Sequence, residues 1–322
     1  MDQRLEQLKV WLKNSGITYQ NIEPASADAS FRRYFRISNE KNTYIVMDAP
    51  PEKEDCKPFI HIANILFNFG LNVPQIFQQD LEQGFLLLSD LGDTVFLSEL
   101  NNSTVDEMYT AAMKSILLMQ KNENPDLPLY DETLLRNELE LFPDWYLIKQ
   151  LGITVSAQQK EVLEKTFDVL IENALAQPQV CVHRDYHSRN LMVNKNNPQQ
   201  PGVIDFQDAV IGAVTYDLVS LLKDCYIDWP REKVEAWVKY FHAEATSFGI
   251  IDKVSFDEFL RWFDLMGLQR HLKVAGIFSR LKHRDGKTGY LKDIPRTMDY
   301  VFDVLERYPE FKPLKNLLGE IL

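Results

Sequence analysis

The chain contains His183-Arg184-Asp185-Tyr186-His187-Ser188-Arg189-Asn190, and fifteen residues beyond Asn190 it carries Asp205 within Ile204-Asp205-Phe206-Gln207-Asp208. Phosphoryl transfer to a hydroxyl group needs one carboxylate to hold the attacking oxygen and oxygen ligands to hold Mg²⁺ on the nucleotide phosphates. Asp185 can supply the first, and Asn190 and Asp205 the second. We therefore predict Asp185 as the catalytic base and Asn190 and Asp205 as metal ligands, against the simpler interpretation of Asp185 as a capping or turn aspartate.

Short strand-like runs flank these side chains at 180–182, 191–193 and 202–204. β-branched runs joined by polar loops predict a small hairpin that presents all three side chains at one edge. A second His283-Arg284-Asp285 lacks this context, because Tyr290 occupies the position five residues after Asp285. The triplet alone is therefore uninformative, and the combination of Asp185, Asn190 and Asp205 carries the prediction.

Composition restricts the class of partner. The 322 residues carry a formal net charge of −12, which argues against a nucleic-acid backbone or an anionic membrane as the main partner. Three widely spaced cysteines and the lack of a long apolar run predict a cytoplasmic protein with free thiols. No obligate protein partner is evident, and a small-molecule substrate is expected.

Residues 28–90 are rich in predicted strands (31–37, 43–47, 75–77 and 84–88) around one helix at 59–69. After Leu91-Gly92-Asp93, which we interpret as a hinge, the periodicity becomes helical over 104–120, 132–150, 157–176, 231–248, 255–282 and 295–306. This order predicts an α+β protein with a bilobal, protein-kinase-like plan. A small β-rich lobe would span 1–91, with an amphipathic N-terminal helix, and a larger helical lobe 92–322.

At this level the motifs resemble a known superfamily. His-x-Asp-x-His-x-x-Asn followed by Ile-Asp-Phe is similar to the aminoglycoside phosphotransferases and choline kinases. Protein kinases differ, because they place lysine where His187 stands. Further stretches resemble the anomeric N-acetylmuramate/N-acetylglucosamine kinases of cell-wall recycling: Ala29-Ser30-Phe31-Arg32-Arg33-Tyr34-Phe35-Arg36, Met47-Asp48-Ala49-Pro50-Pro51, Glu140-Leu141-Phe142-Pro143-Asp144-Trp145-Tyr146 and Asp205-Phe206-Gln207-Asp208-Ala209. The resemblance implies ATP and Mg²⁺ as cofactors and a sugar 1-phosphate as product.

The expected nucleotide-binding residues depart from the kinase pattern. The strand at 43–48 has no lysine to hold the α- and β-phosphates, and the loop around Ser30 and Phe31 lacks the usual glycines. Arg32, Arg33 and Arg36 are the nearest alternative cations, with solvated surface arginines as the competing interpretation. In a strand, Arg32 and Arg36 share one face and Arg33 lies on the other. We expect the adenine to meet the backbone of Ser89, Asp90 and Leu91.

Substrate contacts are predicted from residue type. Trp145 can stack on a pyranose ring and Asp144 can accept hydrogen bonds from its hydroxyls, although a core aromatic is an equal alternative. His187 is either a phosphate contact or a brace for the loop. Arg270, Lys273 and Arg280 lie at helical spacing and form a basic face for the lactyl carboxylate of N-acetylmuramate, or else a solvated surface or a phosphate contact. Asp217 resembles the aspartate that braces the catalytic loop in the superfamily.

These observations predict an ATP-dependent kinase acting on the anomeric hydroxyl of an N-acetylated amino sugar. Two alternatives remain at this point. One is an aminoglycoside or choline phosphotransferase of the same fold. The other is a nucleotide-binding regulatory module without catalysis, which the missing lysine would allow but the intact Asp185, Asn190 and Asp205 disfavour.

Overall fold

The structure is a computed structural model, and it describes residues 2–27, 31–122 and 126–321. The chain folds into two compact units, the first comprising Met1–Ser115 with Arg189–Asp208, the second Ile116–Ser188 with Ala209–Leu322. The chain crosses between the units within the first sequence motif and directly after the second. A functional division at residues 91 and 92 stays a prediction.

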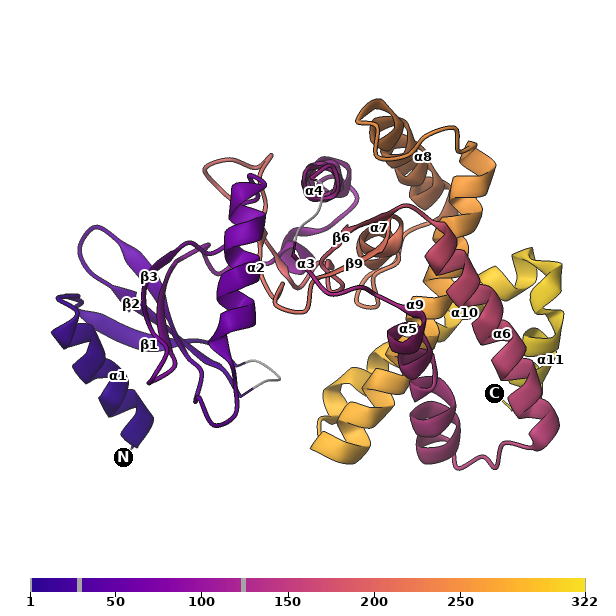
Figure 1. Cartoon of the computed structure of the whole chain (residues 1–322), viewed down its shortest axis with the longest axis horizontal. Coiled ribbons are helices and arrows are strands. Elements are labelled where there is room, and N and C mark those ends of the chain that lie inside the picture. The colour runs from indigo at the N-terminus through magenta and orange to yellow at the C-terminus, as the bar shows by residue number, and fades with distance from the viewer. Residues whose placement is uncertain (1, 28–30, 123–125, 322) are drawn as a thin grey trace. The chain divides into compact units, whose positions relative to one another are not determined.

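The first unit is built on a five-stranded antiparallel sheet (Figure 1). Its strand order is β1-β2-β3-β5-β4, formed by β1(Asn21–Ala27), β2(Arg33–Ser38), β3(Thr43–Asp48), β4(Ile76–Asp80) and β5(Phe85–Ser89). Four of these strands were expected. The edge strand β1 was missed, because Pro24 and the bulge between Pro24 and Ser26 disguise its alternation.

Alternating side chains give the sheet one face toward α1(Gln3–Asn14). Phe35, Ile37 and Val46 are buried on this face against Leu8 and Leu12 of the helix. In Figure 1 the sheet lies between α1 and α2(Cys56–Asn68), which Asp55 caps by accepting a hydrogen bond from the Lys57 amide at 2.9 Å. A short helix, α3(Phe96–Glu99), completes the unit's N-terminal segment before α4(Val105–Gln120).

The strands next to the motifs form two small sheets, not the single hairpin predicted. β7(Leu191–Met192) pairs with β8(Gly202–Val203) in the first unit, and β6(Gln179–Val182) pairs with β9(Val210–Ala213) in the second. The hairpin prediction was wrong because the apolar run 209–214 supplies β6 with another partner. β7 and β8 still place Asn190 and Asp205 at the same end of their hairpin.

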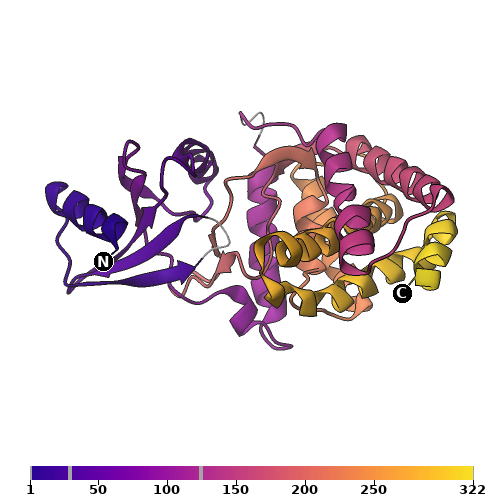
Figure 2. The ribbon, with the colours of Figure 1, turned by 90° about the horizontal axis from the view of Figure 1, so that it is seen from below.

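The second unit is helical and surrounds the long helix α9(Phe256–Asp285), against which α5, α6, α7, α8 and α10 all pack (Figures 1 and 2). Its fully buried Leu268, Leu272 and Ala275 form the side predicted to be apolar. The other helices are α5(Glu132–Leu139), η1(Phe142–Gln150), α6(Ala157–Ala176), α7(Tyr216–Leu222), α8(Arg231–Ser247), η2(Thr288–Asp293), α10(Ile294–Arg307), η3(Pro309–Phe311) and α11(Lys312–Ile321). No helix in the described ranges is both long and apolar enough to cross a membrane.

The helix predicted over 132–150 is two elements. α5 ends at Leu139, and η1 is a nine-residue π-helix beginning at Phe142. Pro143 has no amide hydrogen and cannot continue the α-helical ladder, so the backbone changes its register there. Gly276 lets α9 pass close to the junction between α5 and η1, because a Cβ atom at this position would lie 2.4 Å from the backbone of Leu141.

Candidate active site

The catalytic loop is held by Asp217 at the start of α7. Its carboxylate accepts hydrogen bonds from the backbone amides of His183 at 2.7 Å and Arg184 at 3.0 Å. Asp217 therefore braces the loop, as the sequence indicated. The bond to Arg184 fixes a strained segment, since Arg184 has a φ of 76°, in the left-handed region that side chains rarely adopt.

The following residues of the loop are fixed as well. The Asp185 amide donates to Nδ1 of His183 at 3.2 Å. Ser188 donates to the Asp224 carboxylate from its amide at 2.9 Å and from its hydroxyl at 2.5 Å. Hydrogen bonds therefore hold the loop on both sides of Asp185, at His183 and Arg184 before it and at Ser188 after it.

Positive charge surrounds the Asp185 carboxylate. Burial opposes its ionisation, but the charges of Lys273, His187 and Arg270 outweigh burial and lower the pKa of Asp185 below its usual value. A carboxylate held in the ionised form at neutral pH can accept a hydrogen bond from an acceptor hydroxyl. Asp185 is therefore equipped for the role predicted from sequence.

A buried glutamate beneath the loop was not predicted. Glu138 of α5 forms ion pairs with Arg184 and with Lys273, whose Nζ lies 2.9 Å away, and it accepts a hydrogen bond from the Tyr130 hydroxyl. Lys273 also donates to the Tyr216 hydroxyl at 3.0 Å. The cluster joins α5, α9 and the catalytic loop.

A signal for Glu138 was present in the sequence. The residue stands three and four positions after Leu135 and Leu134, on the apolar side of its helix. A charge at such a position needs a buried partner. In the structure its partners are Arg184 and Lys273.

Asn190 and Asp205 meet in the first unit. The Asn190 side-chain amide lies 3.3 Å from Asp205 Oδ2, and the Ile204 amide donates to the Asn190 carbonyl at 3.1 Å. Asp205 has a φ of 65°, and the Gln207 side chain donates to its Oδ1 at 2.9 Å. The β7–β8 hairpin and Gln207 therefore orient two oxygen donors together.

This donor set fits Mg²⁺ bound with a nucleotide. Such an ion usually takes one or two protein oxygens and completes its shell with phosphates and water. The described part of the chain has no group of three or more histidine, cysteine, aspartate or glutamate side chains able to hold a metal by itself. Asn190 and Asp205 would accordingly hold the ion together with phosphate oxygens.

Each of the three candidate arginines has a carboxylate partner in the first unit. Arg32 lies 3.2 Å from Glu54, Arg33 lies 2.6 Å from Asp48, and Arg36 lies 2.7 Å from Asp90. Arg33 shares the face that packs on α1, because it also pairs with Asp2 of that helix's N-cap. Arg36 contacts the expected adenine segment instead, donating also to the Gly92 carbonyl at 2.9 Å.

The sequence model described as "Phosphotransferase enzyme family" matches residues 21–254, which cover both motifs and the residues that brace them. The protein belongs to this family. The match includes the loop that carries Asp185 and the turn that carries Asp205, and the roles of these side chains stay predictions.

Relatives of this phosphotransferase match it over nearly its full length. It is 45% identical to the N-acetylmuramate/N-acetylglucosamine kinase of Pseudomonas putida over 99% of this chain and 97% of the relative. A protein of the same name from Neisseria meningitidis is 41% identical, covering 99% and 96% of the two chains.

Solved structures agree on the fold. The ADP-bound aminoglycoside phosphotransferase APH(2'')-Ib superposes with a TM-score of 0.62 at 16% identity, covering 94% of this chain and 99% of that one. Choline kinase LicA from Streptococcus pneumoniae gives 0.63 at 11% identity, with 92% and 99% covered. The protein-kinase-like α+β fold of the phosphotransferase is confirmed.

The remaining nucleotide candidates lie in the first unit. Ser89 pairs with Gln75, its amide donating to the Gln75 carbonyl at 2.9 Å. Burial raises the pKa of Asp90, but Arg36 reverses the effect and lowers it overall. Leu91 lies against Gly202, where an added Cβ would come within 3.1 Å of its side chain. Phe31 is exposed, and Ser30 lies outside the described residues.

The substrate candidates fall into two groups. Arg270, Lys273 and His187 all lower the pKa of Asp185 through their charge, and the His187 ring packs edge-on against Tyr226 at 5.3 Å. Asp144 and Trp145 lie on η1, the first exposed and the second half-buried, without side-chain hydrogen bonds or ion pairs in the described ranges. Arg280 is half-buried, and burial lowers its pKa. Thus two of the three residues on the predicted basic face, Arg270 and Lys273, are buried and act on the charge of Asp185.

Proposed function

We propose that this phosphotransferase transfers the γ-phosphate of ATP to the anomeric hydroxyl of N-acetylmuramate or N-acetylglucosamine, giving the sugar 1-phosphate. The observation that carries the proposal is the match over nearly the whole chain, at 45% identity, to a kinase of that name. Asp185 fits the reaction, because its loop is anchored by Asp217 and neighbouring positive charges lower the pKa of its carboxyl group. Such a reaction would serve peptidoglycan recycling in the cytoplasm, where ATP is supplied.

Asp185 is the group that orients the sugar hydroxyl and accepts its proton. An anomeric hydroxyl is more acidic than an ordinary alcohol, so positioning contributes more than basicity. The Asp217 brace and the Glu138 cluster support this role, because they fix the loop from two sides. A rigid loop keeps the carboxylate in the productive geometry.

The nucleotide is assigned to the first unit. Asn190 and Asp205 would hold Mg²⁺, which neutralises developing phosphate charge when bound. Arg32 and Arg36 are the proposed replacements for the missing lysine, with Ser30 and Phe31 as further nucleotide-binding candidates in the same segment of the sequence. We assign the adenine to the backbone of 89–91. Arg33 is the weakest of the three arginine candidates, because its partners lie on the α1 face.

One panel experiment tests the proposal. The protein is incubated with Mg·ATP and N-acetylmuramate, N-acetylglucosamine, kanamycin or choline, and the product is assigned by phosphorus NMR. We expect an anomeric phosphate from one or both sugars. Turnover of kanamycin or choline without turnover of either sugar would refute the proposal in favour of an amine phosphotransferase.

Variants link the activity to the site. Asp185→Asn should abolish turnover while the protein still binds ATP. Asp257→Asn is the matched control, since Asp257 is exposed at the start of α9 and makes no ion pair in the described ranges. Nucleotide binding without turnover of any acceptor by the unmodified protein would favour a regulatory module.

A further inference from the structure

Arg280 differs from the other two basic residues predicted on one side of α9. Lys273 lies 2.9 Å from Glu138, and Nη1 of Arg270 lies 3.8 Å from the Cys225 sulfur. Arg280 forms no side-chain hydrogen bond or ion pair with the residues that the structure describes, and its Nε is buried without a hydrogen-bond partner among them. A guanidinium that has lost water at one nitrogen and found no acceptor in the protein is suited to an external anion.

The side of α9 that carries Arg280 begins at the catalytic loop. Burial raises the pKa of Asp185, but the charges of Lys273 and Arg270, which are themselves buried, help to lower it overall. Residues seven positions apart share one side of an α-helix and are separated by about 10 Å along its axis. Ile277 and Arg280 follow Arg270 and Lys273 at this spacing, and both are only half-buried. A solute can therefore reach this side of α9 two turns beyond the cations that act on Asp185.

Toward the N-terminus of α9 the same side is closed. Met266 and Phe263, four and seven residues before Arg270, are fully buried. An acceptor that approaches Asp185 along this side of the helix therefore passes the turn that carries Arg280.

The Arg280 side chain leans back toward the catalytic loop. Side chains of an α-helix point toward its N-terminus and cover the preceding turn. Burial lowers the pKa of Arg280, and Arg284 adds to this effect. The carboxylates of Asp285 and Glu138 oppose both. Since Glu138 forms the ion pairs beneath the catalytic loop, the guanidinium lies within electrostatic reach of that cluster.

One aromatic ring separates this part of α9 from the catalytic loop. The centroid of the Tyr226 ring lies 5.3 Å from that of His187 and 6.4 Å from that of Phe278. His187 is two residues from Asp185 in the loop, and Phe278 is two residues from Arg280 on α9. The loop and this turn of the helix are therefore neighbours, and one small acceptor can touch both.

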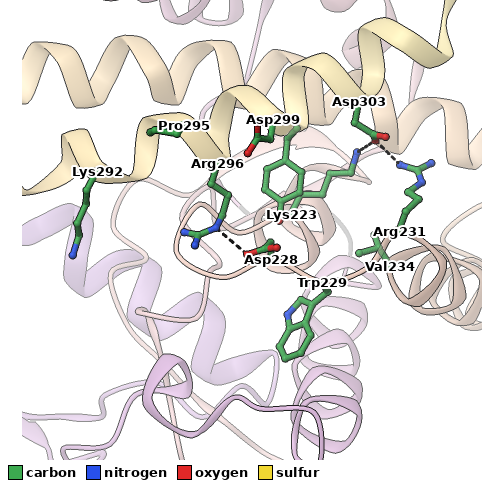
Figure 3. A pocket seen from close by; sticks show the side chains of 11 residues that line it. Lys223, Asp228, Trp229, Arg231, Val234, Lys292, Pro295, Arg296, Asp299 and Asp303 are labelled. Carbon is green, nitrogen blue, oxygen red and sulfur yellow. Dashed lines mark hydrogen bonds and ion pairs between the residues drawn. The ribbon is translucent and has the colours of Figure 1, made fainter.

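A separate cavity of about 500 Å³ in the second unit does not meet this requirement. It lies between the segment that follows α7 and the facing side of η2 and α10, and its lining includes no described residue of 183–190 (Figure 3). Its Arg296 pairs with Asp228 at 3.1 Å, and the Lys233 ammonium lies 5.4 Å from the centroid of the Trp229 ring. An acceptor must reach Asp185, so we assign it to the side of α9 that carries Arg280.

We propose that Arg280 binds the carboxylate of N-acetylmuramate while the anomeric hydroxyl of the same sugar meets Asp185. The inference rests on the proposed function and adds the residue that distinguishes the two acceptors. N-acetylmuramate carries a lactyl carboxylate on C3, where N-acetylglucosamine has a hydroxyl. A guanidinium holds a carboxylate through two parallel hydrogen bonds, and a hydroxyl cannot accept both. Arg280 therefore favours the first sugar and is nearly indifferent to the second.

The first test changes the acceptor and leaves the protein as it is. Steady-state kinetics compare N-acetylmuramate with its carboxamide, in which a neutral amide replaces the lactyl carboxylate. The acid should have a kcat/KM roughly tenfold or more above that of the amide, as expected for a charge-assisted contact. Equal values would overturn the proposal, whether or not any variant folds.

The second test removes the cation. Arg280→Met keeps most of the apolar stem and should abolish the preference for the acid over the amide, whereas Arg280→Lys should retain part of it. The KM for ATP and the kcat/KM for N-acetylglucosamine should stay within about twofold of the values for the unmodified protein. An undiminished preference for the acid in Arg280→Met would overturn the contact. A raised KM for ATP with that preference intact would assign Arg280 to a phosphate instead.

Arg284→Met is the matched control. Arg284 is exposed one turn further along α9, and it pairs with Asp285 at 2.7 Å. This variant should use the acid, the amide and N-acetylglucosamine as the unmodified protein does. If Arg284→Met and Arg280→Met lose the preference for the acid equally, the effect comes from the overall charge of the helix, and a contact at Arg280 is refuted.

Calorimetry separates this proposal from the proposed function. Without ATP, N-acetylmuramate should bind roughly tenfold more weakly to Arg280→Met than to Arg284→Met. If the unmodified protein phosphorylates neither sugar, the proposed function fails, yet this difference in binding would still support the contact. Turnover of both sugars without any such difference would overturn the contact and leave the proposed function standing.

Discussion

The Glu138 carboxylate lies 2.9 Å from the Lys273 ammonium, in a cluster that also contains Arg184 of the catalytic loop. Burial raises the pKa of Glu138, but Lys273 and Arg184 outweigh it, so the pKa is lowered overall. Arg184 directly precedes Asp185 in the chain, and the charge of Lys273 lowers the pKa of Asp185. Glu138 therefore contacts both the loop that carries Asp185 and the lysine whose charge lowers the pKa of Asp185.

Replacement of Glu138 tests these two contacts. In Glu138→Gln two buried cations lose their counter-charge, so we expect the free energy of unfolding to fall by about 3–5 kcal/mol. We also expect kcat to fall about tenfold or more in the folded fraction, because Arg184 no longer holds its left-handed conformation firmly. Urea unfolding and kcat at saturating substrates measure the two effects.

Glu132→Gln is the control on the same helix. Glu132 is exposed and lies 3.7 Å from Arg136, so both quantities should remain close to those of the unmodified protein. Equal stability of Glu138→Gln and Glu132→Gln would show that the cluster contributes little.

Lys273→Met should change the pH profile. Lys273 is the largest of the charges that lower the pKa of Asp185. Without Lys273 the pKa of Asp185 rises. If Asp185 must be ionised for catalysis, the enzyme then loses activity at a higher pH as the solution is acidified. The acid limb of the kcat profile should therefore move toward higher pH.

Lys282→Met provides the comparison, since Lys282 is on the same helix and donates to Gln150 at 2.9 Å. Its acid limb should coincide with that of the unmodified protein. A shift of the Lys273→Met limb toward lower pH would contradict the assignment of Asp185.

The sequence predicted what depends on local spacing. Most helices follow from apolar periodicity, and the candidates Asp185, Asn190 and Asp205 were selected by their order and spacing, with their roles still predictions. The partner of β6 could not be predicted in this way, because Val210–Ala213 lies far along the chain from Gln179–Val182 and pairing depends on tertiary packing.

The partners of charged side chains were harder to predict from the sequence. A basic side of α9 was predicted, but periodicity cannot distinguish a solvated lysine from Lys273, which is buried and paired with Glu138 on another helix.

Arg33 and Arg36 should have separable roles. Arg33 lies 2.6 Å from the buried Asp48 on the α1 face, so Arg33→Ala should lower the free energy of unfolding by about 1–3 kcal/mol and leave the KM for ATP unchanged. Arg36 binds Asp90 and Gly92, so Arg36→Ala should raise the KM for ATP about fivefold. Initial rates and thermal melts compare the pair, and reversed effects would refute the division.

Gln207 should act on the metal through Asp205. In Gln207→Leu the donor to Asp205 Oδ1 is lost, so the carboxylate is less well oriented and about three- to tenfold more Mg²⁺ should be required. Binding of Mn²⁺ in the presence of ADP, followed by electron paramagnetic resonance, measures this without turnover. The exposed Gln79 on β4 supplies the control Gln79→Leu, and equal Mn²⁺ affinities in the two variants would exclude a role for Gln207.

Asp264 should govern part of the protein's stability in acid. Burial opposes its ionisation, but Lys223 and Arg231 lower the pKa of Asp264 from 3.8 to about 2. Because the folded-state pKa is depressed, its contribution is present above pH 4 and is lost as the pH falls toward 2. The loss should amount to roughly 2 kcal/mol of unfolding free energy.

Asp264→Asn should remove this acid-dependent contribution and cost about 3–5 kcal/mol at neutral pH, because Lys223 and Arg231 lose a buried counter-charge. Urea unfolding of both proteins at pH 7 and at several values between pH 4 and pH 2 measures the difference. Asp257→Asn, on the same helix but exposed, should follow the unmodified protein throughout. If Asp264→Asn loses stability with falling pH as steeply as the unmodified protein, Asp264 is not the group responsible.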